Sequence, residues 1–276
     1  MSVLLFLATR SFQITVALTA GMPQPMFSLV FKDVLTAMLK HLNSYICFPQ
    51  REDFGHVKTK LYGLAYIIHV VEAIDGTHVA LVPMHGNEKV YRNKKNYHSI
   101  KVQVVCLENL YISQVCAWYQ GSVHDAFLMR NSVIPQLMTK LYPERAWQVG
   151  GSAYPNHSWL LTPVRNPTLP REVCFNEAHG RTQHVVEWAF GLLKARFRPI
   201  DKTSGALHYS PAKMFKIIVA CCMLHNLALR RNIPYIPDEG ELAVPPGEPP
   251  EMSSEYDSDQ DEGRAMQADL INQYFT

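Results

Sequence analysis

Cysteine pairs of the kind that bind zinc or form a disulfide framework are absent from this sequence. Its six cysteines include no Cys-X-X-Cys pair, and most lie in apolar runs. This usage is typical of reduced core residues in an intracellular protein. The segment Cys222-Met-Leu-His225 has a zinc-like spacing, but no second ligand pair accompanies it, so it indicates two neighbours on an apolar helix.

Long apolar runs without charges are also lacking. No stretch is long enough to span a bilayer without including charged residues, so no membrane span is expected. The opening run Val3–Ala8 resembles the apolar part of a signal peptide. It has no basic flank before it, and Arg10 interrupts it with no small-residue cleavage site following, so we expect no signal peptide. The 276 residues, 47% of them hydrophobic, suffice for one large domain or two modest ones.

Acidic residues are scarce in most of the chain and concentrated at its end. Residues 1–237 carry 25 Lys and Arg against 13 Asp and Glu, a balance of +12, whereas residues 238–276 have a balance of −10. A basic body indicates a polyanionic partner such as DNA, although an ordinary basic surface gives the same count. The acidic tail, residues 232–276, is predicted to be disordered, and its end, Leu270–Phe275, is apolar enough to be a docking motif.

Residues 1–47 are predicted to form an N-terminal helical segment. Leu5–Leu18 has helical apolar spacing, Thr19–Pro23 breaks the pattern, and Gln24–Leu42 resumes it. A helix, a short break containing Gly and a longer helix are the outline of a helix-turn-helix, and equally of two packed helices with no role in DNA binding. Because Met1 begins inside an apolar run with no helix-start signal, this segment could lack its first part.

The remainder is predicted to be a connector, residues 48–69, followed by one α/β domain, residues 70–231. The predicted elements are strands at 70–75, 97–107, 110–119 and 146–149, a short extended piece at 159–161, and helices at 125–142, 176–197 and 211–230. Pro135 is expected to divide the first of these helices. This order is compatible with an RNase H-like domain, in which strand ends gather acidic residues at one edge of the sheet.

Asp75 follows an apolar stretch that predicts a buried strand. Val70, Val71, Ala73 and Ile74 suit a central strand, Asp75 comes where the strand is predicted to stop, and the next residue, a glycine, allows a sharp turn. An acid in this place is only partly solvated and needs cations or hydrogen-bond donors, and a divalent metal is one such partner. An aspartate that ties the turn through its own backbone accounts for the pattern equally well.

Glu187 shares one face of the predicted helix 176–197 with two other residues. Glu187, Gly191 and Lys194 are spaced i, i+4 and i+7. This face would suit a metal ligand with a phosphate-contacting cation beside it. It would also suit a surface ion pair, which is the commoner arrangement.

Together these stretches resemble the PIF/Harbinger transposase-derived nucleases of the DDE superfamily endonucleases, from about Phe6 to Arg231. The resemblance is carried by Ala73–His78, Tyr91–Lys95, Gly121–Asp125, Trp159–Pro163, Asn176–Thr182 and Phe190–Phe197. It implies an RNase H-like fold, a divalent metal (Mg²⁺ or Mn²⁺) and DNA as substrate. It also implies a separate Myb/SANT-like DNA-binding partner and a location in the nucleus, with the cytoplasm as a second location.

Three carboxylates hold the metals in that family, and the resemblance matches the first to Asp75 and the third to Glu187. The second stands in a Gly-Asp-Ser-Gly-Tyr-Pro motif, which here reads Gly-Gly-Ser-Ala-Tyr-Pro over residues 150–155, so Gly151 occupies the position of the missing acid. Between Gly151 and Glu187 lie 35 residues, the familiar DDE spacing. Two-metal hydrolysis needs carboxylates that hold and neutralise ions roughly 3.5–4 Å apart, and glycine supplies neither ligand nor charge.

Asp125 is the predicted substitute for the missing acid. It directly follows the third predicted strand at a helix start, where an aspartate also satisfies backbone donors. The predicted catalytic residues are therefore Asp75, Glu187 and Asp125, the first two as metal ligands. The predicted contacts to DNA phosphates are Arg92, Lys94, Lys95, Arg181, Lys194, Arg196 and Arg198, each of which alone would equally be a solvated surface charge. Two functions stay open: an impaired metal-dependent nuclease, and a non-catalytic DNA- or protein-binding protein.

Overall fold

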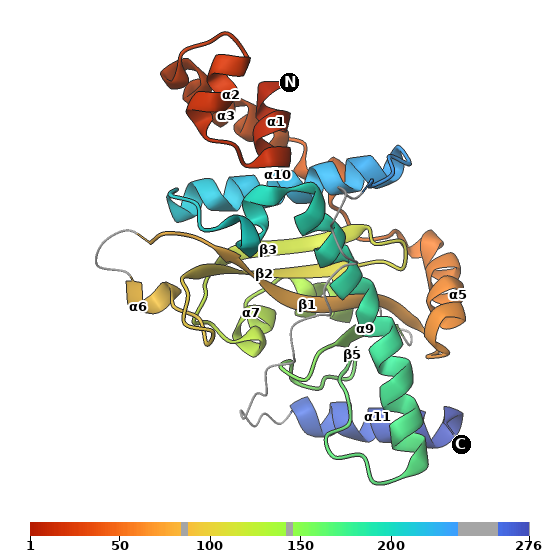
Figure 1. Cartoon of the computed structure of the whole chain (residues 1–276). Coiled ribbons are helices and arrows are strands. Elements are labelled where there is room, and N and C mark those ends of the chain that lie inside the picture. Colours follow the sequence, from red (N-terminus) through yellow and green to blue (C-terminus); the bar gives the residue numbers. More distant parts are fainter. Residues whose placement is uncertain (84–87, 142–145, 237–258, 276) are drawn as a thin grey trace.

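A five-stranded sheet forms the middle of the fold in the computed structural model, which describes residues 1–83, 88–141, 146–236 and 259–275 (Figure 1). The strand order is β3-β2-β1-β4-β5. The strands are β1 (Val70–Ala80), β2 (Ser99–Cys106), β3 (Ile112–Gln120), β4 (Trp147–Gly150) and β5 (Leu160–Leu161). β1, β2 and β3 form an antiparallel meander, and β4 and β5 add to it in parallel. The predicted α/β architecture and meander are confirmed.

β1 continues through Asp75 instead of ending there. Its second half, Asp75–Ala80, pairs with Val104–Ser99 of β2, so the predicted strand end and sharp turn at Gly76 are wrong. On its other side β1 pairs with β4 only as far as Ile74, which lies opposite Gly150. Asp75 is therefore the first residue of β1 that does not pair with β4. Asp75, Gly76 and His78 line a cleft at this edge of the sheet.

Two hydrophobic cores lie on the two faces of the sheet, and alternate strand residues divide between them. Ala73 packs in one core and Ile74 in the other. Helices α1 (Ser2–Thr9), α2 (Gln13–Thr19), α3 (Gln24–Leu39) and α10 (Pro211–Arg230) contribute to the first core, and α5 (Phe54–Ala65), α7 (Asp125–Arg130), α8 (Ile134–Leu141) and α11 (Asp259–Tyr274) to the second. The 27-residue α9 (Pro170–Arg196) crosses the sheet and contributes buried residues to both cores (Figure 1). Short helices α4 (Leu42–Tyr45) and α6 (Glu88–Tyr91) complete the described helices of α type.

α10 has the bounds predicted from its apolar pattern. Among the single helices of the described residues, α10 alone has the length and the apolar composition needed to cross a membrane. Its residues from Ile217 to Met223 are all buried in the first core. Packing against β3 and the N-terminal helices therefore accounts for its composition.

The N-terminal segment departs from its predicted outline at Arg10. The predicted helix Leu5–Leu18 is wrong because α1 ends there: Arg10 has a left-handed backbone (φ 56°), and its guanidinium donates to the carbonyl of Ala206. The predicted break at Thr19–Pro23 is confirmed, since it separates α2 from α3, whose axes differ by 98°. Phe27 and Phe31 of α3 are buried in the first core, so this segment packs as part of the fold. Its role as a DNA-binding helix-turn-helix stays a prediction.

The predicted connector, residues 48–69, contains a packed helix. Val57 and Leu61 of α5 are buried in the second core, where α5 contacts β1 and α9. Two glycines of the predicted connector, Gly55 and Gly63, lie inside this helix with open space around them. A helical glycine costs about 1 kcal/mol relative to alanine, which tertiary packing readily outweighs.

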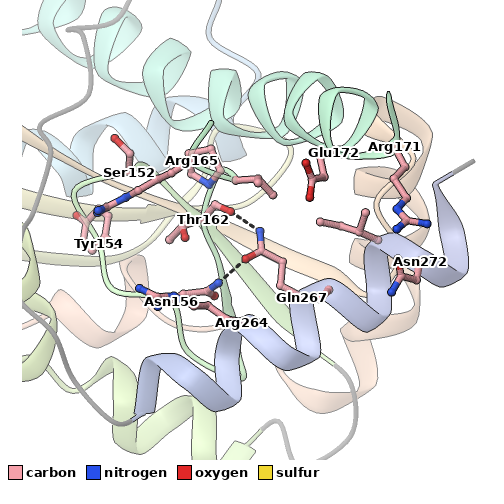
Figure 2. A pocket seen from close by; sticks show the side chains of 14 residues that line it. Ser152, Tyr154, Asn156, Thr162, Arg165, Arg171, Glu172, Arg264, Gln267 and Asn272 are labelled. Atoms are coloured by element: carbon pink, nitrogen blue, oxygen red, sulfur yellow. Dashed lines mark hydrogen bonds between the residues drawn. The ribbon is translucent and has the colours of Figure 1, made fainter. Parts of the chain in front are cut away.

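The acidic end of the chain folds back as α11, so the predicted disorder of residues 232–276 is wrong for 259–274. Leu270 and Ile271 are buried in the second core, and the ring of Phe275 packs edge-on against Phe175. Figure 2 shows Gln267 bridging Asn156 and the carbonyl of Thr162. The apolar end predicted as a docking motif thus packs on its own chain, and residues 237–258 lie outside the described residues.

Candidate active site

A cleft of about 260 Å³ lies where β4 ends beside β1. The three predicted acids and the position of the missing acid all line it, although they come from β1, α7, the segment after β4, and α9. The lining residues are Asp75, Gly76, His78, Lys101, Asp125, Gly151, Ser152, Ala153, Pro163, Asn176, His179, Gly180, Gln183, His184 and Glu187. The structure therefore gathers the predicted site in one place, while the chemical roles of these residues stay predictions.

Asp75 opens to the cleft but is densely surrounded by protein atoms. Burial raises its pKa from 3.8 to about 7, and the charges of Asp125 and Glu187 act in the same direction. The backbone NH of Gly76 donates to its Oδ1 at 2.8 Å, and this bond and Lys101 oppose the rise in pKa. Near neutral pH the Asp75 carboxyl group is thus poised between its charged and neutral forms.

Glu187 and Lys194 project from the same side of α9 toward the open half of β1. Glu187 Oε2 lies 2.7 Å from Nδ1 of His184, one turn earlier, and its side chain is 25% exposed. Lys194 Nζ donates to Oγ1 of Thr77 at 2.7 Å. The predicted face of α9 therefore lies beside Asp75 and Thr77, with a carboxylate and an ammonium group at the site.

Asp125 forms a buried ion pair with Lys101 of β2. Lys101 Nζ lies 2.7 Å from Asp125 Oδ2, and the two side chains are only 3% and 7% exposed. Asp125 is the first residue of α7, and the residue before it, His124, makes no side-chain capping bond. The prediction missed Lys101, whose one signal in the sequence is a lone lysine within the apolar strand Ser99–Cys106.

Gly151 faces Asp75 across the cleft. A Cβ atom at this position would lie 3.8 Å from Asp75 Oδ1 and 3.8 Å from Gln183 Nε2, with nothing nearer. The segment is held by His179, whose Nε2 contacts the carbonyls of Gly150 and Leu161 at 3.1 and 3.2 Å. Burial lowers the pKa of His179 to about 4, so this ring is neutral at physiological pH. A carboxylate at position 151 would therefore have space, a fixed backbone and Asp75 as its neighbour.

The acids present do not fit a two-metal centre. Within the ranges that the structure describes, no group of three or more His, Cys, Asp or Glu side chains is placed to hold a metal ion. Asp75 and Glu187 offer carboxylates, but Asp125 is engaged by Lys101 and Gly151 contributes no ligand. Two divalent ions need more anionic oxygen ligands than this arrangement supplies.

The predicted phosphate contacts lie in different surroundings. Arg196 donates from Nη2 to the carbonyl of Ile233 at 2.7 Å and so holds the segment that follows α10. Lys194 lies beside Thr77 of β1, and Arg198 is half-buried in the turn after α9. The other four are exposed: Arg92, Lys94, Lys95 and Arg181. Their contacts with phosphate stay predictions.

A second cavity, of about 440 Å³, borders the cleft through Ser152 and Pro163. Figure 2 shows α11 forming one of its walls, with Arg165 toward the Ser152 end and Arg171 beside Asn272 at the other. The prediction missed this cavity because it treated the end of the chain as disordered.

Comparison with known proteins places this geometry in context. The family model for DDE superfamily endonucleases matches residues 74–226. The chain is 32% identical over 271 residues to the Rattus norvegicus protein named "Putative nuclease HARBI1", covering 97% of this chain and 75% of the relative. The Homo sapiens protein of the same name is 32% identical over 260 residues, with coverages of 93% and 74%. "Protein ALP1-like" of Arabidopsis thaliana is 27% identical over 229 residues, with coverages of 76% and 55%. No solved structure matches the chain.

Proposed function

The chain belongs to the Harbinger transposase-derived nucleases of the DDE superfamily endonucleases, and on this basis we propose that it binds DNA while hydrolysing phosphodiester bonds weakly or not at all. The observation that carries this proposal is Gly151, which faces Asp75 and which the family resemblance matches to the second metal-holding acid. The strand order and the placement of the acids beside β4 support an RNase H-like form of the fold.

The chemistry of the cleft supports weak hydrolysis. Divalent ions in such reactions activate water and stabilise the leaving oxygen, and carboxylates hold them and cancel their charge. This chain keeps Asp75 and Glu187 but has no side chain at position 151, and a proton competes for Asp75 because its pKa is about 7. Loss of a metal-holding group could remove several kcal/mol of transition-state stabilisation.

DNA binding draws support from charge and position. Residues 1–237 carry a balance of +12, and Lys194 stands on the same helix as Glu187, beside Thr77 of β1. Cations beside a cleft attract a phosphate backbone without regard to sequence. Sequence-specific binding would then come from a separate Myb/SANT-like protein, and the protein would act in the nucleus, with the cytoplasm as a second location.

A second candidate function is a nuclease dependent on Mg²⁺ or Mn²⁺ in which Asp125 replaces the missing acid. One observation favours it, because Asp125 lines the same cleft as Asp75 and Glu187. The ion pair with Lys101 opposes it, since an engaged carboxylate is a poor ligand for a divalent ion.

Cleavage and binding assays on the full chain separate these functions. Duplex DNA is incubated with the wild type, Gly151→Asp and the uncharged control Gly151→Asn, in Mg²⁺ or Mn²⁺, and DNA affinity is measured separately in EDTA by fluorescence anisotropy. The proposal expects DNA binding by all three proteins and cleavage by Gly151→Asp alone. Cleavage by the wild type that is lost in Asp125→Asn would instead establish the second candidate, and absence of DNA binding by the wild type would refute the first.

A further inference from the structure

Lys101 is a charged residue buried beside the acids of the cleft, and the metal chemistry described above assigns it no role. We propose that Lys101 is the resident cation of this carboxylate site: its ammonium group holds Asp125 and thereby keeps divalent ions from using that acid as a ligand. The inference rests on the proposed function only in treating the cleft as the nuclease site of the fold.

The geometry of the pair shows that it is fixed in place. The Nζ–Oδ2 distance of 2.7 Å is that of a charge-assisted hydrogen bond, and both side chains are almost completely buried. A buried ammonium group is costly unless a counter-ion compensates it, and removal of one partner from such a pair leaves an uncompensated buried charge. Breaking the pair would therefore leave Asp125 and Lys101 as buried charges without each other.

The backbone of β1 is shaped around this pair. A Cβ atom on Gly76 would lie 2.3 Å from Asp125 Oδ1 and 3.4 Å from Lys101 Cε. Real Cβ atoms do not approach that closely, so a side chain at position 76 would force the carboxylate of Asp125 to move. The pair thus lies directly against the residue that follows Asp75, and its charges act on the pKa of Asp75.

Charge balance explains what the lysine does there. Three acids, Asp75, Asp125 and Glu187, line one cleft, and positive charge is needed to offset the repulsion among their carboxylates. Lys101 supplies positive charge from within the protein and occupies an oxygen that the ion would need. Divalent ions should then bind the wild type weakly, and its folding should not depend on them.

Binding of Mn²⁺ alone, without DNA, tests the proposal on the full chain. Isothermal titration calorimetry and electron paramagnetic resonance are applied to the wild type, Lys101→Gln and the double variant Lys101→Gln/Asp125→Asn. The control is Lys60→Gln, because Lys60 is 48% exposed and forms a longer ion pair, of 3.5 Å, with Glu108. We expect Lys101→Gln to bind Mn²⁺ at least about tenfold more tightly than the wild type, because the substitution removes the cation that competes with the ion for Asp125. The double variant and the control should bind no better than the wild type.

Three results would overturn the proposal. The first is equal Mn²⁺ affinity in the wild type and Lys101→Gln, and the second is tight binding that persists in the double variant, which would exclude Asp125 as the ligand. The third concerns folding: if Lys101→Gln is unfolded in EDTA, added Mn²⁺ must restore its thermal unfolding transition, and failure to do so refutes the proposal. None of these readouts involves DNA, so failure of the proposed DNA binding would be recognised separately.

Discussion

Replacement of Gly151 by aspartate should make the stability of this protein depend on divalent ions. The new Cβ atom would lie 3.8 Å from Asp75 Oδ1 and equally far from Gln183 Nε2, which is ordinary van der Waals contact. The backbone at this position does not require glycine, since its φ lies outside the left-handed region. The substitution therefore adds a carboxylate with little steric strain, and its effect should be mainly electrostatic.

The magnitude follows from the closeness of the two acids. Unit charges about 4 Å apart repel by about 4 kcal/mol at an effective dielectric constant near 20. Protonation relieves part of this repulsion, because the pKa of Asp75 is already about 7. In EDTA at pH 8, Gly151→Asp should therefore be less stable than Gly151→Asn by about 2 kcal/mol. Mn²⁺ at 100 times its Kd would restore about 2.7 kcal/mol, a rise in Tm of about 5–10 °C for a protein of this size.

Differential scanning calorimetry at pH 8 measures this effect directly. Gly151→Asp, Gly151→Asn and the wild type are compared in EDTA and in Mn²⁺. Only the aspartate variant should show a large upward shift of Tm with the ion. Equal shifts in the aspartate and asparagine variants would show that position 151 does not place its side chain beside Asp75, and the assignment of this position would then be wrong.

Three further substitutions test other parts of the structure. Burial raises the pKa of Glu72 from 4.5 to about 7, so the stability that its protonated form contributes is present below pH 4.5 and lost as the pH rises to 7. In urea unfolding at pH 8, Glu72→Gln should therefore be about 3 kcal/mol more stable than the wild type. Near pH 4.5 the variant should be no more stable than the wild type. Gly263→Ala would bring a Cβ atom within 2.8 Å of the backbone at Asn156, so it should destabilise the fold by about 1–3 kcal/mol and expose α11 to proteases, whereas Gly55→Ala, which has open space, should not. Lys194→Gln should weaken DNA binding and reduce the slope of log affinity against log salt concentration by about one. An unchanged affinity and slope in anisotropy titrations would exclude Lys194 as a phosphate contact.

Regular apolar patterns made much of the fold predictable. The strands of the meander and the bounds of α10 were evident because each buries a continuous or alternating apolar face. The second half of β1 was not evident, since Asp75, Gly76 and Thr77 carry no apolar signal. That half is a strand because β2 supplies hydrogen bonds along its whole length, and such pairing between distant segments leaves no mark in the local sequence.

The candidate site, too, was predictable only in part from the sequence. The positions of Asp75, Gly151 and Glu187 came from motifs, and the structure brings all three to one cleft. The partner of Asp125 could not be predicted, because Lys101 lies 24 residues earlier in the chain and meets it only when α7 packs beneath β2. A lone lysine in an apolar strand indicates that some buried acid must compensate it, but the sequence does not identify that acid.

Glycine shows why local signals mislead in this chain and why Gly151 is different. Gly76 was interpreted as a turn and Gly55 as part of a connector, yet Gly76 lies in a strand that pairs with β2, and Gly55 lies in a helix that packing stabilises. At Gly263 the contact with a neighbouring backbone excludes any side chain. At Gly151 no contact and no backbone angle demands glycine, and the space beside Asp75 would accept a carboxylate. Glycine at this position is therefore not a requirement of the fold, and the loss of a metal ligand here stays a prediction.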